Sequence, residues 1–79
     1  MKAEFFSRQG CHLCELMYSQ VRALFPDDVP IRVIDIDEDP ELQRRYDFRV
    51  PVFAVDGEIF AEGRLDEADF IDQLNHYSK

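Results

Sequence analysis

The chain has 79 residues, and its 9 Lys and Arg residues against 17 Asp and Glu residues give a net charge of −8. This length is close to the lower limit for a self-sufficient hydrophobic core, so we expect residues 1–79 to form a single domain. Hydrophobic residues make up 46% of the chain, which predicts a folded protein and argues against disorder. The acidic balance argues against nucleic acid as a partner, because its phosphates would be repelled.

The sequence also argues against a membrane protein. No apolar run approaches the roughly 20 residues that a membrane-spanning helix requires. After Met1-Lys2 we find neither the apolar stretch nor the cleavage site of a signal peptide. We therefore expect a cytoplasmic monomer with no membrane attachment, in a compartment that keeps most thiols reduced.

The first part of the chain predicts a strand, a helix and a second strand. Residues 3–7 are short and aromatic and lead to Gly10, a pattern typical of a strand and turn. Residues 31–36 are rich in β-branched side chains and predict the second strand. Between these strands, apolar residues at helical spacing predict an amphipathic helix that ends near Phe25-Pro26. They are Leu13, Leu16, Met17, Val21 and Leu24.

The rest of the chain predicts a short helix, a hairpin and a final helix. Asp39-Pro40 favours a helix start, since Asp is a good N-cap and Pro fits the first helical position. Residues 50–55 predict a third strand, and Asp56-Gly57 predicts a tight turn into a fourth strand over residues 58–61. Asp66 is expected to cap the last helix. Its inward stripe is predicted to comprise Ala68, Ile71 and Leu74.

The predicted order β-α-β-α-β-β-α indicates an α/β fold with a four-stranded mixed sheet flanked by helices. A strand–helix–strand crossover gives a parallel pair, and a hairpin gives an antiparallel pair. We expect most of the aromatic residues to form the core and not a cofactor site; these are Phe5, Phe6, Phe53, Phe60 and Phe70.

The motif Cys11-His12-Leu13-Cys14 carries the strongest chemical signal. A bridge between cysteines so close in sequence stabilises a fold very little, so a purely structural disulfide is the weaker interpretation. Cys11 is predicted at the start of the first helix, where unpaired N–H groups favour a sulfur anion. Cys14 is predicted to face inward. This asymmetry suits thiol–disulfide exchange, in which Cys11 attacks a disulfide and Cys14 resolves the mixed disulfide.

A zinc site is the alternative interpretation of the motif, since Cys11, His12 and Cys14 can all bind zinc. A closed zinc site needs four ligands, whereas the sequence has no second cysteine pair and only one further histidine, His76. We therefore favour redox chemistry and expect no bound metal. His12, when protonated, would stabilise the thiolate and make the pair more oxidising. Otherwise it is a solvated residue at the helix start.

Three features together resemble the glutaredoxin branch of the thioredoxin superfamily. They are a Cys-x-x-Cys after the first strand, Val50-Pro51 at the head of the third, and a final hairpin and helix. The resemblance covers almost the whole chain and is greatest to small bacterial glutaredoxin-like proteins. It implies a thioredoxin-like fold, a cis Val50-Pro51 bond beside the thiols, and a role in cell redox homeostasis. The backbone of Val50 would pair with an extended peptide or with glutathione.

The resemblance implies a disulfide reductase whose partner is a disulfide-containing protein or a glutathione mixed disulfide. No cofactor is expected to stay bound, and glutathione is one possible reductant. The second hypothesis is an electron donor that a thioredoxin-type reductase recharges. The third is not enzymatic: the protein would bind or transfer an iron–sulfur cluster held by the first cysteine and glutathione.

Three arginines are predicted to form a basic rim around the thiols. Arg8 precedes Cys11, Arg49 precedes Val50-Pro51, and Arg64 precedes the last helix. Such a rim would lower the pKa of Cys11 and attract substrate carboxylates; alternatively, the arginines point elsewhere. Acidic residues at the start of the last helix would weaken a contact with glutathione, so we expect weak, salt-dependent binding. These acids are Asp66, Glu67 and Asp69.

Overall fold

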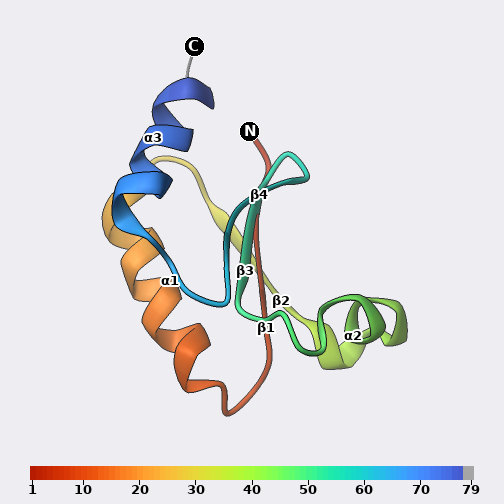
Figure 1. Ribbon diagram of the computed structural model, residues 1–79. Coiled ribbons are helices and arrows are strands. Elements are labelled where there is room, and N and C mark those ends of the chain that lie inside the picture. Colours follow the sequence, from red (N-terminus) through yellow and green to blue (C-terminus); the bar gives the residue numbers. More distant parts are fainter. Residues whose placement is uncertain (78–79) are drawn as a thin grey trace.

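A four-stranded sheet in the order β2-β1-β3-β4 forms the centre of the computed structural model, which describes residues 1–77. The predicted order of elements and the mixed sheet are confirmed (Figure 1). In chain order the elements are β1 (Ala3–Ser7), α1 (His12–Leu24), β2 (Ile31–Asp35), the 3-10 turn η1 (Ile36–Glu38), α2 (Pro40–Tyr46), β3 (Val52–Val55), β4 (Glu58–Glu62) and α3 (Glu67–Tyr77).

The register of the strands gathers three loops at one end of the sheet. β1 pairs with β2 in parallel and with β3 in antiparallel fashion, and β3 pairs antiparallel with β4. Phe6 in β1 lies opposite Val52 in β3, which in turn lies opposite Glu62 in β4. The end of β1, the start of β3 and the end of β4 are therefore neighbours. The loops that follow β1, precede β3 and follow β4 meet at this end, the lower one in Figure 1.

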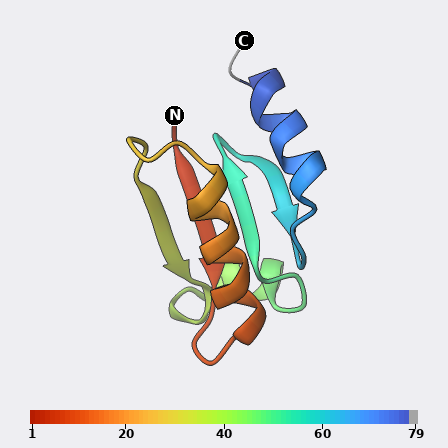
Figure 2. The same cartoon turned by 90° about the vertical axis from the view of Figure 1, so that its left-hand side faces the viewer.

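Helices cover both faces of the sheet and create two buried clusters. α1 and α3 lie on one face and α2 lies on the other (Figures 1 and 2). Phe53 anchors the larger cluster through ring contacts with Phe25, Phe60 and Phe70. Phe6 stacks on Tyr46 in the cluster under α2. All five aromatic residues predicted for the core are buried, and each contributes about 1.5–3 kcal/mol by its burial.

The buried stripes of the two longer helices differ from the prediction. In α1 the buried residues are Cys14, Met17 and Val21, whereas Leu13 and Leu16 are 54% and 57% exposed. Successive helical residues turn by about 100°, so a stripe through Cys14 and Met17 leaves Leu16 on the flank.

No helix within residues 1–77 is long and apolar enough to cross a lipid bilayer.

α3 has a different phase from the one predicted. Ala68 and Ile71 are exposed, so the predicted stripe was wrong for both; Leu74 is half-buried against the core. The inward residue of the first turn is Phe70, which is fully buried. Phe70 therefore sets the rotation of α3, and Leu74 and Tyr77 follow it at helical spacing on the same side.

Local signals at helix starts and at the hairpin are confirmed. Asp39 accepts a hydrogen bond from the N–H of Glu41 at 2.9 Å, and Pro40 begins α2. Asp56 and Gly57 have φ angles of 50° and 85°, the left-handed conformation that a two-residue hairpin turn requires. The third strand begins at Val52, two residues later than predicted.

Candidate active site

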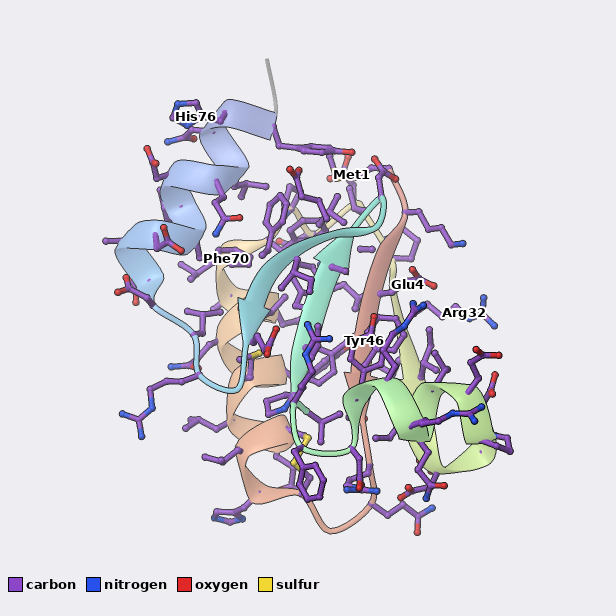
Figure 3. The ribbon with its side chains drawn as sticks, turned by 45° about the vertical axis from the view of Figure 1, so that its right-hand side comes forward. Met1, Glu4, Arg32, Tyr46, Phe70 and His76 are labelled. Carbon is purple, nitrogen blue, oxygen red and sulfur yellow. A yellow bond between two sulfur atoms is a disulfide. The ribbon has the colours of Figure 1, made fainter. Side chains whose placement is uncertain are left out.

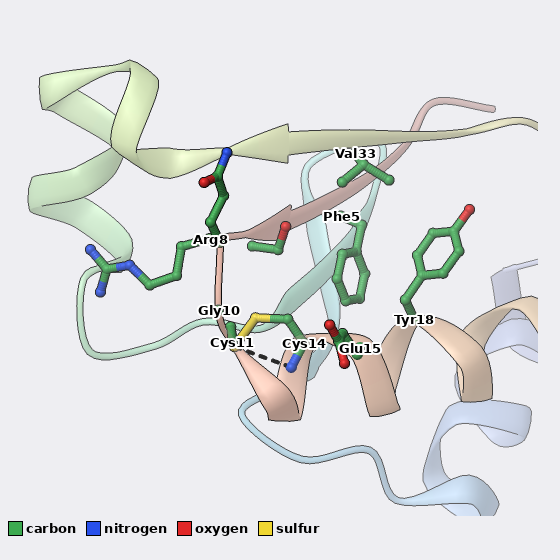
Figure 4. Close-up of a pocket in the computed structure, with 10 residues that line it drawn as sticks. Phe5, Arg8, Gly10, Cys11, Cys14, Glu15, Tyr18 and Val33 are labelled. Atoms are coloured by element: carbon green, nitrogen blue, oxygen red, sulfur yellow. Dashed lines mark hydrogen bonds between the residues drawn. A yellow bond between two sulfur atoms is a disulfide. The ribbon is translucent and has the colours of Figure 1, made fainter.

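The two cysteines lie at the start of α1, at the end of the sheet where the three loops meet (Figure 4). Cys11 is the N-cap of α1, and its Sγ accepts a hydrogen bond from the backbone N–H of Cys14 at 3.1 Å. The carbonyl of Cys11 accepts the N–H of Glu15, which closes the first helical turn. The sulfur thus takes the position that a Ser, Thr or Asp oxygen usually takes at a helix start.

Cys11 and Cys14 are joined by a disulfide in this structure, and they differ in exposure. Cys11 is half-buried, whereas Cys14 is 4% exposed and packs in the core with Met17 and Val21. A partner can therefore approach the first cysteine more easily than the second, as the sequence predicts. The assignment of separate chemical roles to the two sulfurs stays a prediction.

The Val50–Pro51 peptide bond is cis, as the family resemblance implies. The backbone N–H groups of Arg49 and Val50 both donate to the carbonyl of Tyr46, at 2.9 and 3.1 Å. The carbonyl of Pro51 accepts the N–H of Gly63 at 2.7 Å, which ties this segment to the loop after β4. Pro51 is buried and directly precedes β3, whose first residue lies opposite the end of β1.

The side chain of Arg8 points away from the sulfurs (Figure 4). It binds two carboxylates, those of Asp37 and Asp47. Its Nη2 lies 2.7 Å from Oδ1 of Asp37, and its Nη1 lies 2.9 Å from Oδ1 of Asp47. The same Nη1 donates to the carbonyl of Asp47 at 3.1 Å. The hydrogen bond between Arg8 and Asp37 raises the pKa of Arg8 and lowers the pKa of Asp37. Arg8 therefore joins the cysteine loop to η1 and to the loop after α2.

Arg49 is also paired, in this case with a residue of β4. Its Nε and Nη2 donate to the two carboxylate oxygens of Glu62 at 3.0 and 2.8 Å. The guanidinium lies over the ring of Tyr46, 5.2 Å from its centre. The hydrogen bonds between Arg49 and Glu62 raise the pKa of Arg49 and lower that of Glu62. This bidentate geometry is the one that arginine frequently adopts with a bound carboxylate.

Arg64 and His12 are the most open of the predicted site residues. Arg64 is exposed and forms no ion pair within residues 1–77; it lines a groove with Leu13 and Leu16 of α1. The side chain of His12 is fully exposed, and its Nδ1 lies 4.0 Å from a carboxylate oxygen of Glu15. Arg8 and Arg49, in contrast, are paired with carboxylates of the same chain. Two of the three arginines at this end of the sheet are therefore compensated.

A pocket of about 380 Å³ opens beside the disulfide (Figure 4). Its apolar wall comes from Phe5, Tyr18 and Val33, and it reaches both Cys11 and Cys14. The rings of Phe5 and Tyr18 pack edge to face, 5.4 Å apart. Sequence reasoning missed this pocket because its wall comes from three separate elements. It stays open because β2 is an edge strand, and Val33 remains 55% exposed.

Sequence reasoning also missed Phe48, whose side chain is 97% exposed. It stands between Asp47 and Arg49, and both of these neighbours are held by ion pairs. An isolated apolar residue between two charged ones, just before Val50-Pro51, was the signal available in the sequence.

No group of three or more His, Cys, Asp and Glu side chains in the described part of the chain is placed to hold a metal ion. His76, the other histidine considered as a zinc ligand, lies near the end of α3, away from the cysteine end of the sheet (Figure 3). The fold therefore does not bring it to Cys11 and Cys14.

A family model described as Glutaredoxin-like domain (DUF836) matches residues 2–75. The chain belongs to this family. The Glutaredoxin-like protein YDR286C homolog of Dictyostelium discoideum is 39% identical over a 70-residue alignment, which covers 80% of this chain and 65% of that protein. The chain thus spans less than two thirds of the length of this curated relative.

Solved structures show that this glutaredoxin-like chain has a thioredoxin-like fold. Protein XcR50 from X. campestris superposes with a TM-score of 0.79 and 23% identity, covering 94% of this chain and 96% of that one. Thioredoxin 1 from Thermosipho africanus has a TM-score of 0.68 and 23% identity, covering 99% and 94%. The family, the fold and the Cys11–Cys14 pair together indicate a redox function.

Proposed function

We propose that the protein is a dithiol oxidoreductase that reduces disulfides through Cys11 and Cys14. The observation that carries this proposal is the position of the Cys11 sulfur, which caps α1 and accepts the N–H of Cys14. A backbone donor and the positive end of a helix both favour the anionic form of sulfur, the reactive form in exchange. The half-buried first cysteine and the buried second one provide the required order of attack.

The reaction proceeds in two exchange steps. The thiolate of Cys11 attacks one sulfur of a substrate disulfide; that disulfide bond breaks, and the departing thiolate takes a proton from solvent. Cys14 then loses its proton and attacks the sulfur of Cys11, which releases the second substrate thiol and forms the Cys11–Cys14 disulfide. Two electrons pass to the substrate. Glutathione or a thioredoxin-type reductase then supplies two electrons that reduce the Cys11–Cys14 disulfide.

Val50 and Pro51 form the proposed platform for the substrate chain. An extended segment can add to a protein as a short strand through main-chain hydrogen bonds. The N–H of Val50 is already donated to Tyr46, so its carbonyl is the group left for such a bond. The proposed pairing therefore uses an N–H from the substrate.

Replacement of each cysteine by serine tests the assignment. We expect Cys11→Ser to abolish the acceleration of insulin disulfide reduction by dithiothreitol, because no thiolate remains at the helix cap. We expect Cys14→Ser to accumulate a mixed disulfide on Cys11, visible by mass spectrometry, because resolution is blocked. Full activity of Cys11→Ser would contradict the proposal.

A further inference from the structure

We propose that this site favours protein disulfides flanked by apolar residues over glutathione disulfide, because its own carboxylates already occupy Arg8 and Arg49. The inference rests on the proposed function and adds the substrate class. It also assigns a role to Glu62: this residue determines specificity by keeping Arg49 from binding a substrate carboxylate.

Arg49 directly precedes Val50-Pro51, the proposed platform for the substrate chain, and it is already bound to Glu62. Two hydrogen bonds, at 2.8 and 3.0 Å, use one edge of the guanidinium, and Tyr46 lies against its face. The backbone on both sides is fixed, since the N–H of Arg49 binds the carbonyl of Tyr46 and Glu62 pairs with Val52 in the sheet. A substrate carboxylate would have to displace Glu62 from this edge or bind beside its negative charge, and either arrangement gains little.

Arg8 is committed in the same way by two carboxylates. Asp37 accepts hydrogen bonds from its Nε and Nη2, and Asp47 binds its Nη1. Glutathione disulfide carries a net negative charge at neutral pH, and the chain itself carries −8. With these two arginines compensated, Arg64 is left unpaired at this end within residues 1–77, and the site has less local positive charge to offset that repulsion.

The apolar side chains near the site point to a different substrate. Phe48 is 97% exposed, although the hydrogen bond from Arg8 to the carbonyl of Asp47 ties its loop to the cysteine loop. An aromatic ring on a fixed backbone loses little freedom on binding, and such residues often dominate protein interfaces. Leu13, the residue before Cys14, is also more than half exposed. These side chains suit a protein with apolar residues beside its disulfide and a neutral or basic surface.

The substitution Glu62→Gln tests the electrostatic part of the inference. The pre-reduced protein is mixed with glutathione disulfide or with its ester, in which every carboxylate is an ethyl ester. Oxidation of the protein is followed by acid quench and mass spectrometry. We expect the ratio of the two rate constants, acid over ester, to rise about two- to fivefold in Glu62→Gln, the range for one exposed charge pair. The rise should shrink as salt is added.

Glu58→Gln is the matched control. It removes the same charge from the other end of β4, where Glu58 forms no ion pair within residues 1–77. We expect the acid-to-ester ratio to stay unchanged there. An unchanged ratio in Glu62→Gln, or an equal rise in Glu58→Gln, would overturn the inference. Urea unfolding of both variants checks that the fold is retained.

Phe48→Ala tests the apolar part. The protein substrate is insulin, and its reduced chains are the product. The rate constant for the insulin disulfides is divided by the rate constant for glutathione disulfide. We expect this ratio to fall about fivefold or more, the loss typical of an aromatic interface anchor. Ile71→Ala is the control, because Ile71 is an exposed apolar residue on α3, outside the proposed surface. An equal fall in both variants, or none in Phe48→Ala, would contradict the assignment.

The proposed function and the proposed substrate class are contradicted by different results. If the wild-type protein reacts with no disulfide faster than Cys11→Ser does, the proposed function is wrong. A different result would contradict only the substrate class. In that case the wild-type protein reacts with the disulfides, but the acid-to-ester ratio is unchanged in Glu62→Gln and the protein-to-glutathione ratio is unchanged in Phe48→Ala.

Discussion

The loops that lead into α1 and α3 leave the same end of the sheet, and the two helices are capped by different chemistry. α1 begins at a sulfur: Sγ of Cys11 accepts the N–H of Cys14 at 3.1 Å. α3 begins at a carboxylate: Asp66 accepts the N–H of Asp69 at 3.1 Å, and Asp69 is itself acidic. Both helix ends expose backbone donors and partial positive charge. Only the first presents that charge to a group that can react.

An acidic protein can still hold one sulfur at an electrostatically favourable helix start. At α3 the helix end is filled by the chain's own acids, so it has little to offer an anionic ligand. At α1 the capping atom is the sulfur that we propose as the nucleophile, so the favourable charge would act on it directly. The start of α1 is thus the helix end that we expect to activate a sulfur, whereas the start of α3 is already occupied by the chain's own acids.

The largest expected effect separates the two sulfurs of α1. In the reduced protein we expect iodoacetamide to modify Cys11 about tenfold or more faster than Cys14, because thiolate character and access both favour the first cysteine. We also expect the Cys11 rate to reach half its maximum at a pH below the ~8.5 of a free thiol. Peptide mapping after timed quenching measures both rates as a function of pH.

The urea-unfolded protein is the matched control, since it has no helix and its two cysteines should react alike. The pH at half-maximal rate is the informative quantity. Reduced access slows alkylation without changing that pH, whereas apolar burial would raise it and a helix start would lower it. If Cys11 gives the same pH profile folded and unfolded, the helix start does not activate the sulfur and the comparison with α3 loses its meaning.

The second effect concerns the cap of α3. We expect Asp66→Ala to lower the free energy of unfolding by about 1 kcal/mol, because the N–H of Asp69 loses its acceptor. Urea unfolding measures the change. Glu67→Ala removes the same charge from the same turn without removing that bond, so a smaller loss is expected. An equal loss in both variants would show that the charge, and not the cap, stabilises α3.

Much of the fold could be predicted because its signals are local. Asp39-Pro40 and Asp66 cap helices through hydrogen bonds to residues two or three positions away. Asp56-Gly57 makes its turn through its own backbone conformation. The phase of α3 was mispredicted because it depends on Phe70 packing against Phe53 and Phe60, a contact between distant elements.

The candidate site shows the same difference between local signals and contacts between distant residues. The position of Cys11 at a helix start follows from a short motif, whereas the partners of the arginines do not. Arg49 and Glu62 are 13 residues apart, and Arg8 and Asp37 are 29 apart. Only the strand register brings each pair together. Sequence alone therefore placed the arginine loops at one end of the sheet, but it could not show that their charge is compensated.

The smallest expected effect is the pH dependence of the Arg49–Glu62 pair. The hydrogen bonds from Arg49 lower the pKa of Glu62 from its ordinary 4.5. A carboxyl whose pKa is lower in the folded state stabilises the fold above its unfolded pKa, and this contribution is lost as pH falls through the folded pKa. We expect Glu62→Gln to lower the urea midpoint by no more than about 0.5 M at pH 7, as suits an exposed pair.

In acid, well below 4.5, the wild-type protein and Glu62→Gln should unfold at the same urea concentration, since Glu62 is then protonated and the ion pair is gone. Glu58→Gln again supplies the control. Glu58 binds no arginine within residues 1–77, so the difference in urea midpoint between this variant and the wild type does not depend on an ion pair. A Glu62→Gln difference that persists in acid would mean that packing, and not charge, holds Arg49 in place. Arg49 would then stay turned toward β4 even without its carboxylate, and the acid-to-ester ratio would not respond to the substitution.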